Sequence, residues 1–213
     1  MPNDRLVDRL VGELKPVRPR KVGGDALKLL LLCAIEFVLV LSLGAMRADM
    51  PKAMGMPSFW WKLGSLGLIA LVGGSVAVLS FDPVRSPRHG LRWLVAIIMI
   101  SLAGGWMVDA SREESSALAA RLEWREGLRC VIEMVLLSVP AVIGLGLMMR
   151  RGAPTDSRGT ALAAGIGAAS WGAFVFVFAC PYDDPLYIAV WYAVGCGVVT
   201  LFARLVLPPL TRW

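Results

Sequence analysis

Six long apolar stretches, separated by short polar segments, dominate the pattern of hydrophobic and polar residues along this chain of 213 residues. They lie at residues 27–46, 60–81, 91–108, 128–149, 160–180 and 186–207. About 20 consecutive apolar residues cross the roughly 30 Å hydrocarbon core of a bilayer as a helix. The pattern therefore predicts an all-α membrane protein with six transmembrane helices. Residues 26–207 would form the membrane domain and residues 208–213 a short tail.

The positive charges are distributed unevenly between the segments that connect these stretches. With a cytoplasmic amino terminus, 15 of the 22 Lys and Arg residues fall on the cytoplasmic side. Because cytoplasmic segments of membrane proteins are enriched in Lys and Arg, both termini are predicted to be cytoplasmic. A hydrophobic content of 57% is too high for a soluble domain. The net charge of +6 is therefore attributed to orientation in the membrane, and no direct binding of nucleic acid is expected.

The first 25 residues precede the apolar stretches and begin with an amphipathic pattern. At helical spacing one face carries the apolar side chains Leu6, Val7, Leu10, Val11 and Leu14. Asn3 can cap this helix, and Pro16 disfavours helical geometry at the residue before it. So short a helix is marginal in water until its apolar face is buried, and a protein groove and the bilayer surface fit the periodicity equally well. Residues 17–25, which are basic and contain two glycines, are predicted to be a flexible tether.

Two cysteines fall at the same predicted level of the membrane, on its outer side. Cys130 begins the fourth apolar stretch and Cys180 ends the fifth. Glu133, Asp183 and Asp184 lie close to them in sequence and are candidate accessory ligands. Thiolates and carboxylates together attract soft or transition-metal cations, and two thiols can exchange with a disulfide. A structural disulfide or two unrelated buried thiols fit the sequence equally well, and the identity of any metal stays open.

An acidic residue, Glu36, lies near the middle of the first stretch, where a carboxylate is costly unless it is protonated or hydrogen-bonded. We expect a contact between helices there. The alternative function is a small six-helix transporter or channel that uses Glu36 and Glu133 as intramembrane acids. The chain has one histidine and no nucleophile or metal-ligand spacing, so neither enzymatic activity nor a cofactor is expected. Small residues spaced by four in the fifth stretch predict close helix packing, and residues 109–127 predict a short surface helix.

Three features taken together resemble the NrsF-like integral-membrane anti-sigma factors. One is the amino-terminal pattern Leu6-Val-Asp-Arg-Leu10 and Leu14-Lys-Pro-Val17, and another is the set of six apolar stretches. The third is the pair Cys130 and Cys180, the latter within Cys180-Pro-Tyr-Asp-Asp-Pro-Leu-Tyr-Ile-Ala-Val-Trp191. The resemblance covers nearly the whole chain. Members of this family are bacterial inner-membrane proteins that restrain an extracytoplasmic-function (ECF) sigma factor.

The resemblance implies a multi-pass location in the bacterial inner membrane and an ECF sigma factor as the partner. It implies that the amino-terminal helix binds this sigma factor and keeps it from RNA polymerase. The implied contact residues are Leu6, Val7, Leu10, Val11, Leu14, Pro16 and Val17. It further implies that Cys130 and Cys180 sense heavy-metal or oxidative stress in the envelope, after which the sigma factor is released. Cys33 and Cys196 are interpreted as small apolar residues within packed helices.

Overall fold

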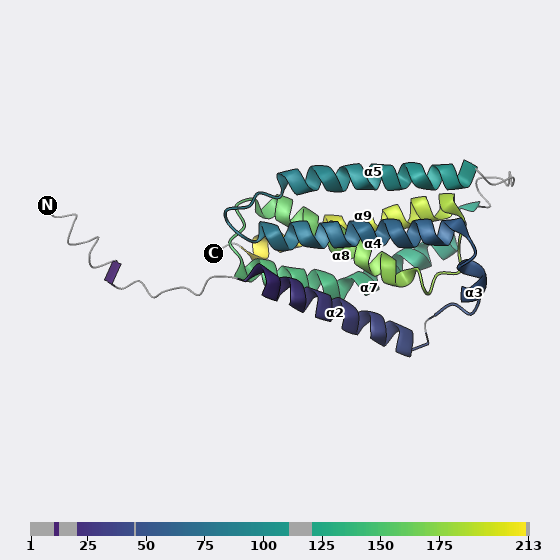
Figure 1. The fold of residues 1–213 in the computed structure, drawn as a ribbon, viewed down its shortest axis with the longest axis horizontal. Coiled ribbons are helices and arrows are strands. Elements are labelled where there is room, and N and C mark those ends of the chain that lie inside the picture. Colours follow the sequence, from purple (N-terminus) through teal and green to yellow (C-terminus); the bar gives the residue numbers. More distant parts are fainter. Residues whose placement is uncertain (1–10, 13–20, 45, 111–120, 212–213) are drawn as a thin grey trace.

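The computed structural model describes residues 11–12, 21–44, 46–110 and 121–211, and over these ranges the regular structure is helical, with no strand. Seven helices with both ends within these ranges follow one another (Figure 1). They are α2 (Val22–Ser42), α3 (Met50–Ala53), α4 (Pro57–Ser80), α5 (Arg88–Ala110), α7 (Trp124–Arg151), α8 (Ser157–Phe176) and α9 (Pro185–Leu210). All except α3 are long helices that run side by side (Figure 1). The predicted all-helical class is confirmed over the described residues.

Five of these helices, α4, α5, α7, α8 and α9, are long and apolar enough to cross a membrane. The sixth long helix, α2, has 21 residues, but every window of 18 residues within it includes the charged residues Asp25, Lys28 and Glu36. That charge content, rather than its length, separates α2 from the other five, because charged groups are costly in the hydrocarbon core. The chain is thus a helical membrane protein with five candidate spans, and the sixth span stays a prediction.

Several helix boundaries differ from those predicted, among them the end of the first helix at Ser42 instead of residue 46. The first helix begins at Val22, so the two glycines assigned to the tether, Gly23 and Gly24, belong to α2. The fifth long helix, α8, ends at Phe176 instead of Cys180, which leaves residues 177–184 as a connecting loop. In the predicted surface helix at 109–127, residues 111–120 lie outside the described residues, and α7 already begins at Trp124.

Helix α8 lies at the centre of the bundle, between α4 and α7 (Figure 1). Its backbone packs closely against both neighbours because glycines of α8 lie at the two contacts. A Cβ added to Gly167 would lie 2.7 Å from the backbone nitrogen of Gly74 in α4, and one added to Gly172 would lie 2.6 Å from the backbone nitrogen of Ser138 in α7. Such distances are shorter than real Cβ contacts, so the backbones approach only because both residues lack a side chain. The predicted packing role of the small residues in α8 is confirmed, whereas an added Cβ at Gly197 in α9 would meet open space.

Two long helices, α2 and α5, lie at the periphery of the bundle (Figure 1). Glu36 is the buried residue of α2, and Leu94 and Gly105 are those of α5. A cavity of about 650 Å³ separates part of α2 from α4, α7 and α8. Because few of its side chains are buried, α2 is held less firmly than the central helices.

The connections gather at two ends of the bundle. At one end, the Ala153 amide donates to the Phe81 carbonyl over 3.2 Å, which joins the α7–α8 and α4–α5 connections. The start of α2 and the end of α9 lie at this end too (Figure 1). The other end, here called the α3 end, holds α3, the loop 177–184 and the start of α7. Of the predicted sigma-binding residues, Leu6, Val7, Leu10, Leu14, Pro16 and Val17 lie outside the described residues, and Val11 is helical and exposed.

Candidate functional site: a thiol pair beside a buried ion-pair cluster

The loop 177–184 at the α3 end is shaped by the residues that start the next helix. Asp184 caps α9, because its Oδ1 accepts hydrogen bonds from the amides of Leu186 at 2.9 Å and Tyr187 at 3.2 Å. Pro185 occupies the first turn of α9, where a missing amide hydrogen costs nothing. The helix α9 therefore starts directly after the loop, and Cys180 of the loop packs in one buried cluster with Cys130 of α7.

The structure brings Cys130 and Cys180 together, as the topology suggested. Both thiols are free and buried, with 4% and 0% of their surface exposed. They lie in the same buried cluster, and Cys130 Sγ lies 3.2 Å from the Tyr187 hydroxyl. The Cys180 thiol lies 3.8 Å from the Tyr182 carbonyl oxygen. Two reduced thiols in contact form a site that can be oxidised or alkylated, but only by a reagent that reaches the buried interior.

A cluster of three buried charges, Arg47, Lys62 and Asp183, includes part of this loop. Lys62 of α4 has a fully buried side chain, and its Nζ donates to Asp183 Oδ1 and to the Tyr182 carbonyl, both over 3.0 Å. Arg47 binds the same carboxylate through two nitrogens, over 3.0 and 2.7 Å. Charges this deeply buried are stable only when they are paired and hydrogen-bonded, so Asp183 holds both cations in place.

Arg47 also binds the backbone of the cysteine loop. Its amide donates to the Phe178 carbonyl over 2.9 Å, and its guanidinium donates to the carbonyls of Cys180 at 3.0 Å and Pro181 at 3.2 Å. The same guanidinium forms two 2.7 Å contacts with Asp49, which hold the pKa of that carboxyl down at about 2. The segment that follows α2 is therefore fastened directly to the loop that carries Cys180.

The surroundings of Cys180 favour its ionised form. The pKa of the Cys180 thiol is lowered, first by the hydrogen bond from Cys130 and then, against the effect of burial, by the Lys62 ammonium. A thiolate is the nucleophilic form of cysteine and the form that binds metals. Cys180 is thus the more acidic thiol of the pair.

The predicted accessory acids have other partners. Asp183 pairs with Arg47 and Lys62, and Asp184 pairs with Arg121, which also contacts Asp109. Glu133 is half-buried on α7 and forms a 3.0 Å pair with Arg129, one turn away on the same helix. Within the described part of the chain, no group of three or more His, Cys, Asp or Glu side chains is placed to hold a metal ion.

Neither cation of this site, Arg47 or Lys62, was predicted from the sequence to take part in it. Lys62 could have been recognised from the sequence, because it is the single charged residue in the apolar stretch 60–81. A charge within such a stretch is costly and often has a functional or structural partner. Arg47 lies in a short polar loop, where a charged residue is common, so the sequence did not indicate that it is buried.

Glu36 makes the contact between helices that the sequence predicted. The indole nitrogen of Trp171 in α8 donates to Glu36 Oε2 over 2.9 Å. Glu36 and Glu133, the two acids of the transporter alternative, have separate partners, Trp171 and Arg129. No observation on the described residues favours that alternative.

The fold and this site define a class: a multi-helix membrane protein with a buried, reduced thiol pair at one end of its bundle. Residues 10–213 match the model of the family NrsF, described as "Negative regulator of sigma F". The chain therefore belongs to the NrsF family.

Two curated relatives carry corresponding names. The "Anti-sigma-F factor NrsF" of Caulobacter vibrioides is 27% identical over 229 aligned residues, which cover 100% of both chains. The "Probable anti-sigma-F factor NrsF" of Azospira oryzae is 28% identical over 182 residues, 83% of this chain and 82% of the relative. No solved structure matches the chain.

Proposed function

We propose that this protein is a membrane-embedded negative regulator of an ECF sigma factor. The observation that carries the proposal is the match to the NrsF family over residues 10–213, together with a relative named as an anti-sigma-F factor that aligns over the whole chain. The proposed role is to bind and sequester, and it needs no enzymatic step. The proposed location is the bacterial inner membrane, with both termini in the cytoplasm.

The sigma factor binds the amphipathic helix at the amino terminus in this proposal. An apolar stripe of Leu6, Leu10 and Leu14, extended by the neighbouring predicted contact residues, is suited to a groove on a partner protein. The acidic residues Asp4, Asp8 and Glu13 complement the basic surface expected of a DNA-binding partner. A sigma factor held in this way at the membrane is kept from RNA polymerase.

Release is proposed to follow a chemical change at Cys130 and Cys180. The support is their mutual contact, their reduced state and the lowered pKa of the Cys180 thiol. Oxidation of the pair, or binding of a thiophilic metal such as cadmium, links the two sulfurs and draws loop 177–184 into a new position.

Arg47 provides the route from the thiols to the amino terminus. It binds the carbonyls of Cys180 and Pro181, and it lies a few residues after the end of α2 at Ser42. Movement of the loop therefore pulls on α2, a peripheral helix whose other end leads to the sigma-binding segment. Coupling of this kind needs two arrangements of α2, one of which binds the sigma factor more tightly.

The binding test uses the full-length protein in lipid nanodiscs, titrated with the ECF sigma factor encoded next to its gene. Leu10→Asp places a charge on the apolar face, and Gly12→Asp places the same charge on the polar face, where an added Cβ meets no atom within 4 Å. Leu10→Asp should weaken binding by at least about 2 kcal/mol, roughly 30-fold, because the charge would be buried at the interface. Equal effects of the two substitutions would reject the apolar stripe as the contact.

The sensing test compares Cys130→Ser and Cys180→Ser with Cys33→Ser, a half-buried thiol on α2. The readout is a sigma-dependent reporter in cells exposed to cadmium or to the thiol oxidant diamide. Induction should be lost in the first two variants and kept in the third. Full induction in the Cys130 and Cys180 variants would remove the sensing role and leave sigma binding intact.

A further inference from the structure

The cavity of about 650 Å³ between α2 and the central helices follows the first half of α2. Its first and last lining residues on this helix are Val22 and Cys33, which helical geometry separates by about 16 Å. Leu30 of α2 and Leu71 of α4 also line it, and they are 63% and 67% exposed on the apolar outside of the bundle. The cavity is therefore open to the hydrocarbon phase between these two helices.

The side chains of its wall offer no free hydrogen-bonding group to an occupant. The lining is aliphatic, aromatic or glycine except for Cys33, Ser75 and Trp171. The Ser75 hydroxyl donates to the Leu71 carbonyl over 2.7 Å, and the Trp171 indole donates to Glu36 over 2.9 Å. A thiol such as that of Cys33 behaves as a small apolar group. An occupant must therefore be apolar along its length, because a polar group would lose its hydrogen bonds with water.

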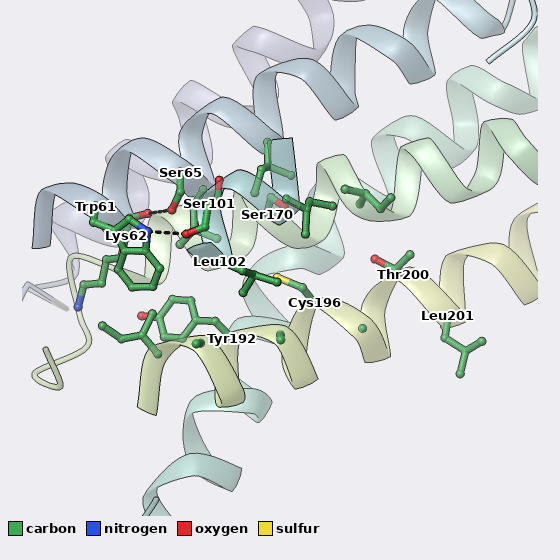
Figure 2. A pocket seen from close by; sticks show the side chains of 18 of the residues that line it. Trp61, Lys62, Ser65, Ser101, Leu102, Ser170, Tyr192, Cys196, Thr200 and Leu201 are labelled. Atoms are coloured by element: carbon green, nitrogen blue, oxygen red, sulfur yellow. Dashed lines mark hydrogen bonds between the residues drawn. The ribbon is translucent and has the colours of Figure 1, made fainter. Parts of the chain in front are cut away.

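A second cavity, of about 380 Å³ between α4, α5, α8 and α9, has a different wall (Figure 2). Two cations and four hydroxyl side chains line it: Lys62, Arg204, Ser65, Ser101, Ser170 and Thr200. Such a wall is suited to an occupant with polar groups. Of the two cavities, the one beside α2 is the one suited to a hydrocarbon chain.

The two ends of the cavity beside α2 differ in polarity. The end at Val22 directly follows the exposed Lys21, and the exposed Arg151 ends α7 at the same end of the bundle. The other end is lined by Trp171 and Phe174, whose rings stack with their centroids 5.4 Å apart. Basic residues at one end and an apolar far end match the order of groups in a phospholipid, an anionic phosphate followed by a hydrocarbon chain.

We infer that this cavity is a lipid-binding site, which holds one acyl chain of a phospholipid and thereby completes the packing of α2 against the bundle. Its length supports the assignment. One leaflet contributes half of the roughly 30 Å hydrocarbon core, about 15 Å, and the cavity extends about 16 Å along α2. In the orientation given under the proposed function, on which this part of the inference rests, the lipid belongs to the cytoplasmic leaflet.

A bound chain would strengthen the attachment of a weakly held helix. Glu36 is the buried residue of α2, and between Val22 and Cys33 the cavity separates the helix from α4, α7 and α8. An acyl chain in this space buries apolar surface on both sides. Removal of the lipid should therefore loosen the first half of α2. Because α2 leads to the proposed sigma-binding segment, it should also weaken binding of the sigma factor.

The first test counts bound lipid. The full-length protein is reconstituted in nanodiscs of palmitoyl-oleoyl phosphatidylglycerol, transferred to dodecyl maltoside and analysed by native mass spectrometry. The wild-type protein should retain one lipid molecule. On α2, Ala26 is half-buried and lines the cavity, whereas Ala34 is exposed and does not line it. Ala26→Trp should therefore retain no lipid, and Ala34→Trp should retain one.

A second variant fills the same space from the opposite side. Ala70 of α4 also lines the cavity, so Ala70→Trp should retain no lipid. Circular dichroism verifies that each variant is folded, and Ala70→Trp decides the question if Ala26→Trp does not fold. Wild-type protein that retains no lipid, or equal retention in the wild type and both cavity variants, would overturn the site.

The second test locates the chain. A phosphatidylglycerol that carries a diazirine near the methyl end of its chain is cross-linked in the nanodisc, and the labelled peptides are identified by mass spectrometry. Cross-links should fall on Trp171 or Phe174, at the far end of the cavity. Labels confined to outward residues such as Leu31, which is 52% exposed, would overturn the site, because they report lipid around the bundle.

The consequence for α2 is measured by sigma-factor affinity in the same nanodiscs and after removal of the lipid. Weaker binding without lipid supports the packing role, and unchanged binding overturns it. The comparison of Leu10→Asp with Gly12→Asp tests sigma binding whatever the lipid result. Failure of the lipid site and failure of the proposed function are therefore distinguishable.

Discussion

The buried carboxylate of Asp183 offers the sharpest test of how the thiol loop is held. Its side chain is 9% exposed and accepts hydrogen bonds from Arg47 and Lys62, whose side chains are 2% and 0% exposed. Asp183→Asn keeps the shape of the side chain but removes its charge. Two buried cations would then face a neutral amide.

The expected loss follows from the cost of leaving a buried charge unpaired. Breaking a buried ion pair by removing one partner costs about 3 to 5 kcal/mol. Asparagine keeps one acceptor oxygen and Arg47 keeps Asp49, so the lower end of that range applies. About 3 kcal/mol corresponds to roughly a 100-fold increase in the fraction of molecules with an undocked loop.

Amide hydrogen exchange of Arg47 measures this undocking. Its amide donates to the Phe178 carbonyl of the loop over 2.9 Å, so it exchanges when the loop moves away. Asp49→Asn is the matched control, because Asp49 binds the same guanidinium from a position that is 48% exposed and is therefore well solvated. Exchange about 100-fold faster in Asp183→Asn and nearly unchanged in Asp49→Asn is expected. Equal exchange rates in the two variants would refute the view that the buried cluster holds the loop.

Three further predictions concern the cations and the packing. Lys62→Met should raise the pH midpoint at which Cys180 becomes reactive, because the Lys62 ammonium lowers the pKa of that thiol. The rate of reaction with a small neutral thiol reagent, measured as a function of pH, gives this midpoint. An unchanged midpoint would contradict the prediction. Arg47→Lys keeps the charge but loses the paired contacts with the loop carbonyls, so a sigma-dependent reporter should rise in unstressed cells, and a silent reporter would argue against this route. Gly167→Ala should lower the stability of the folded bundle by about 1 to 3 kcal/mol, because the added Cβ would clash with the α4 backbone. Gly64→Ala should leave the stability unchanged, because the added Cβ meets open space. Equal thermal midpoints of the two variants in nanodiscs would contradict this.

The apolar stretches and the distribution of charge indicated a helical membrane protein. Both are properties of short segments of the chain and can be recognised without the tertiary structure. Runs of apolar residues long enough to cross a bilayer must form helices in order to satisfy their backbone groups, so the long helices could be located from the sequence. The prediction that Cys180 and Cys130 lie at the same side of the membrane followed from the number of predicted membrane-spanning helices between them. The small residues of α8 predicted its close packing for a similar reason, since residues spaced by four share one helix face.

The sequence alone did not show where each helix ends or which charges pair. Extension of the fifth apolar stretch to Cys180 was wrong because apolar content continues past Phe176, where the chain leaves the helix. The apolar pattern of α9 likewise gave no indication that an added Cβ at Gly197 would meet open space.

What the sequence determined by itself is the helical membrane architecture, the family and the pair of cysteines, all of which depend on residue type and order along the chain. Only the tertiary structure decided the environment of those cysteines. Arg47, Lys62 and Asp183 come from three separate segments, and their buried ion pairs form only after α4 and the loop 177–184 have packed together. A cavity of about 380 Å³ likewise arises only where α4, α5, α8 and α9 meet. Burial and pairing of charge depend on which surfaces meet in space, and local sequence patterns do not contain that information.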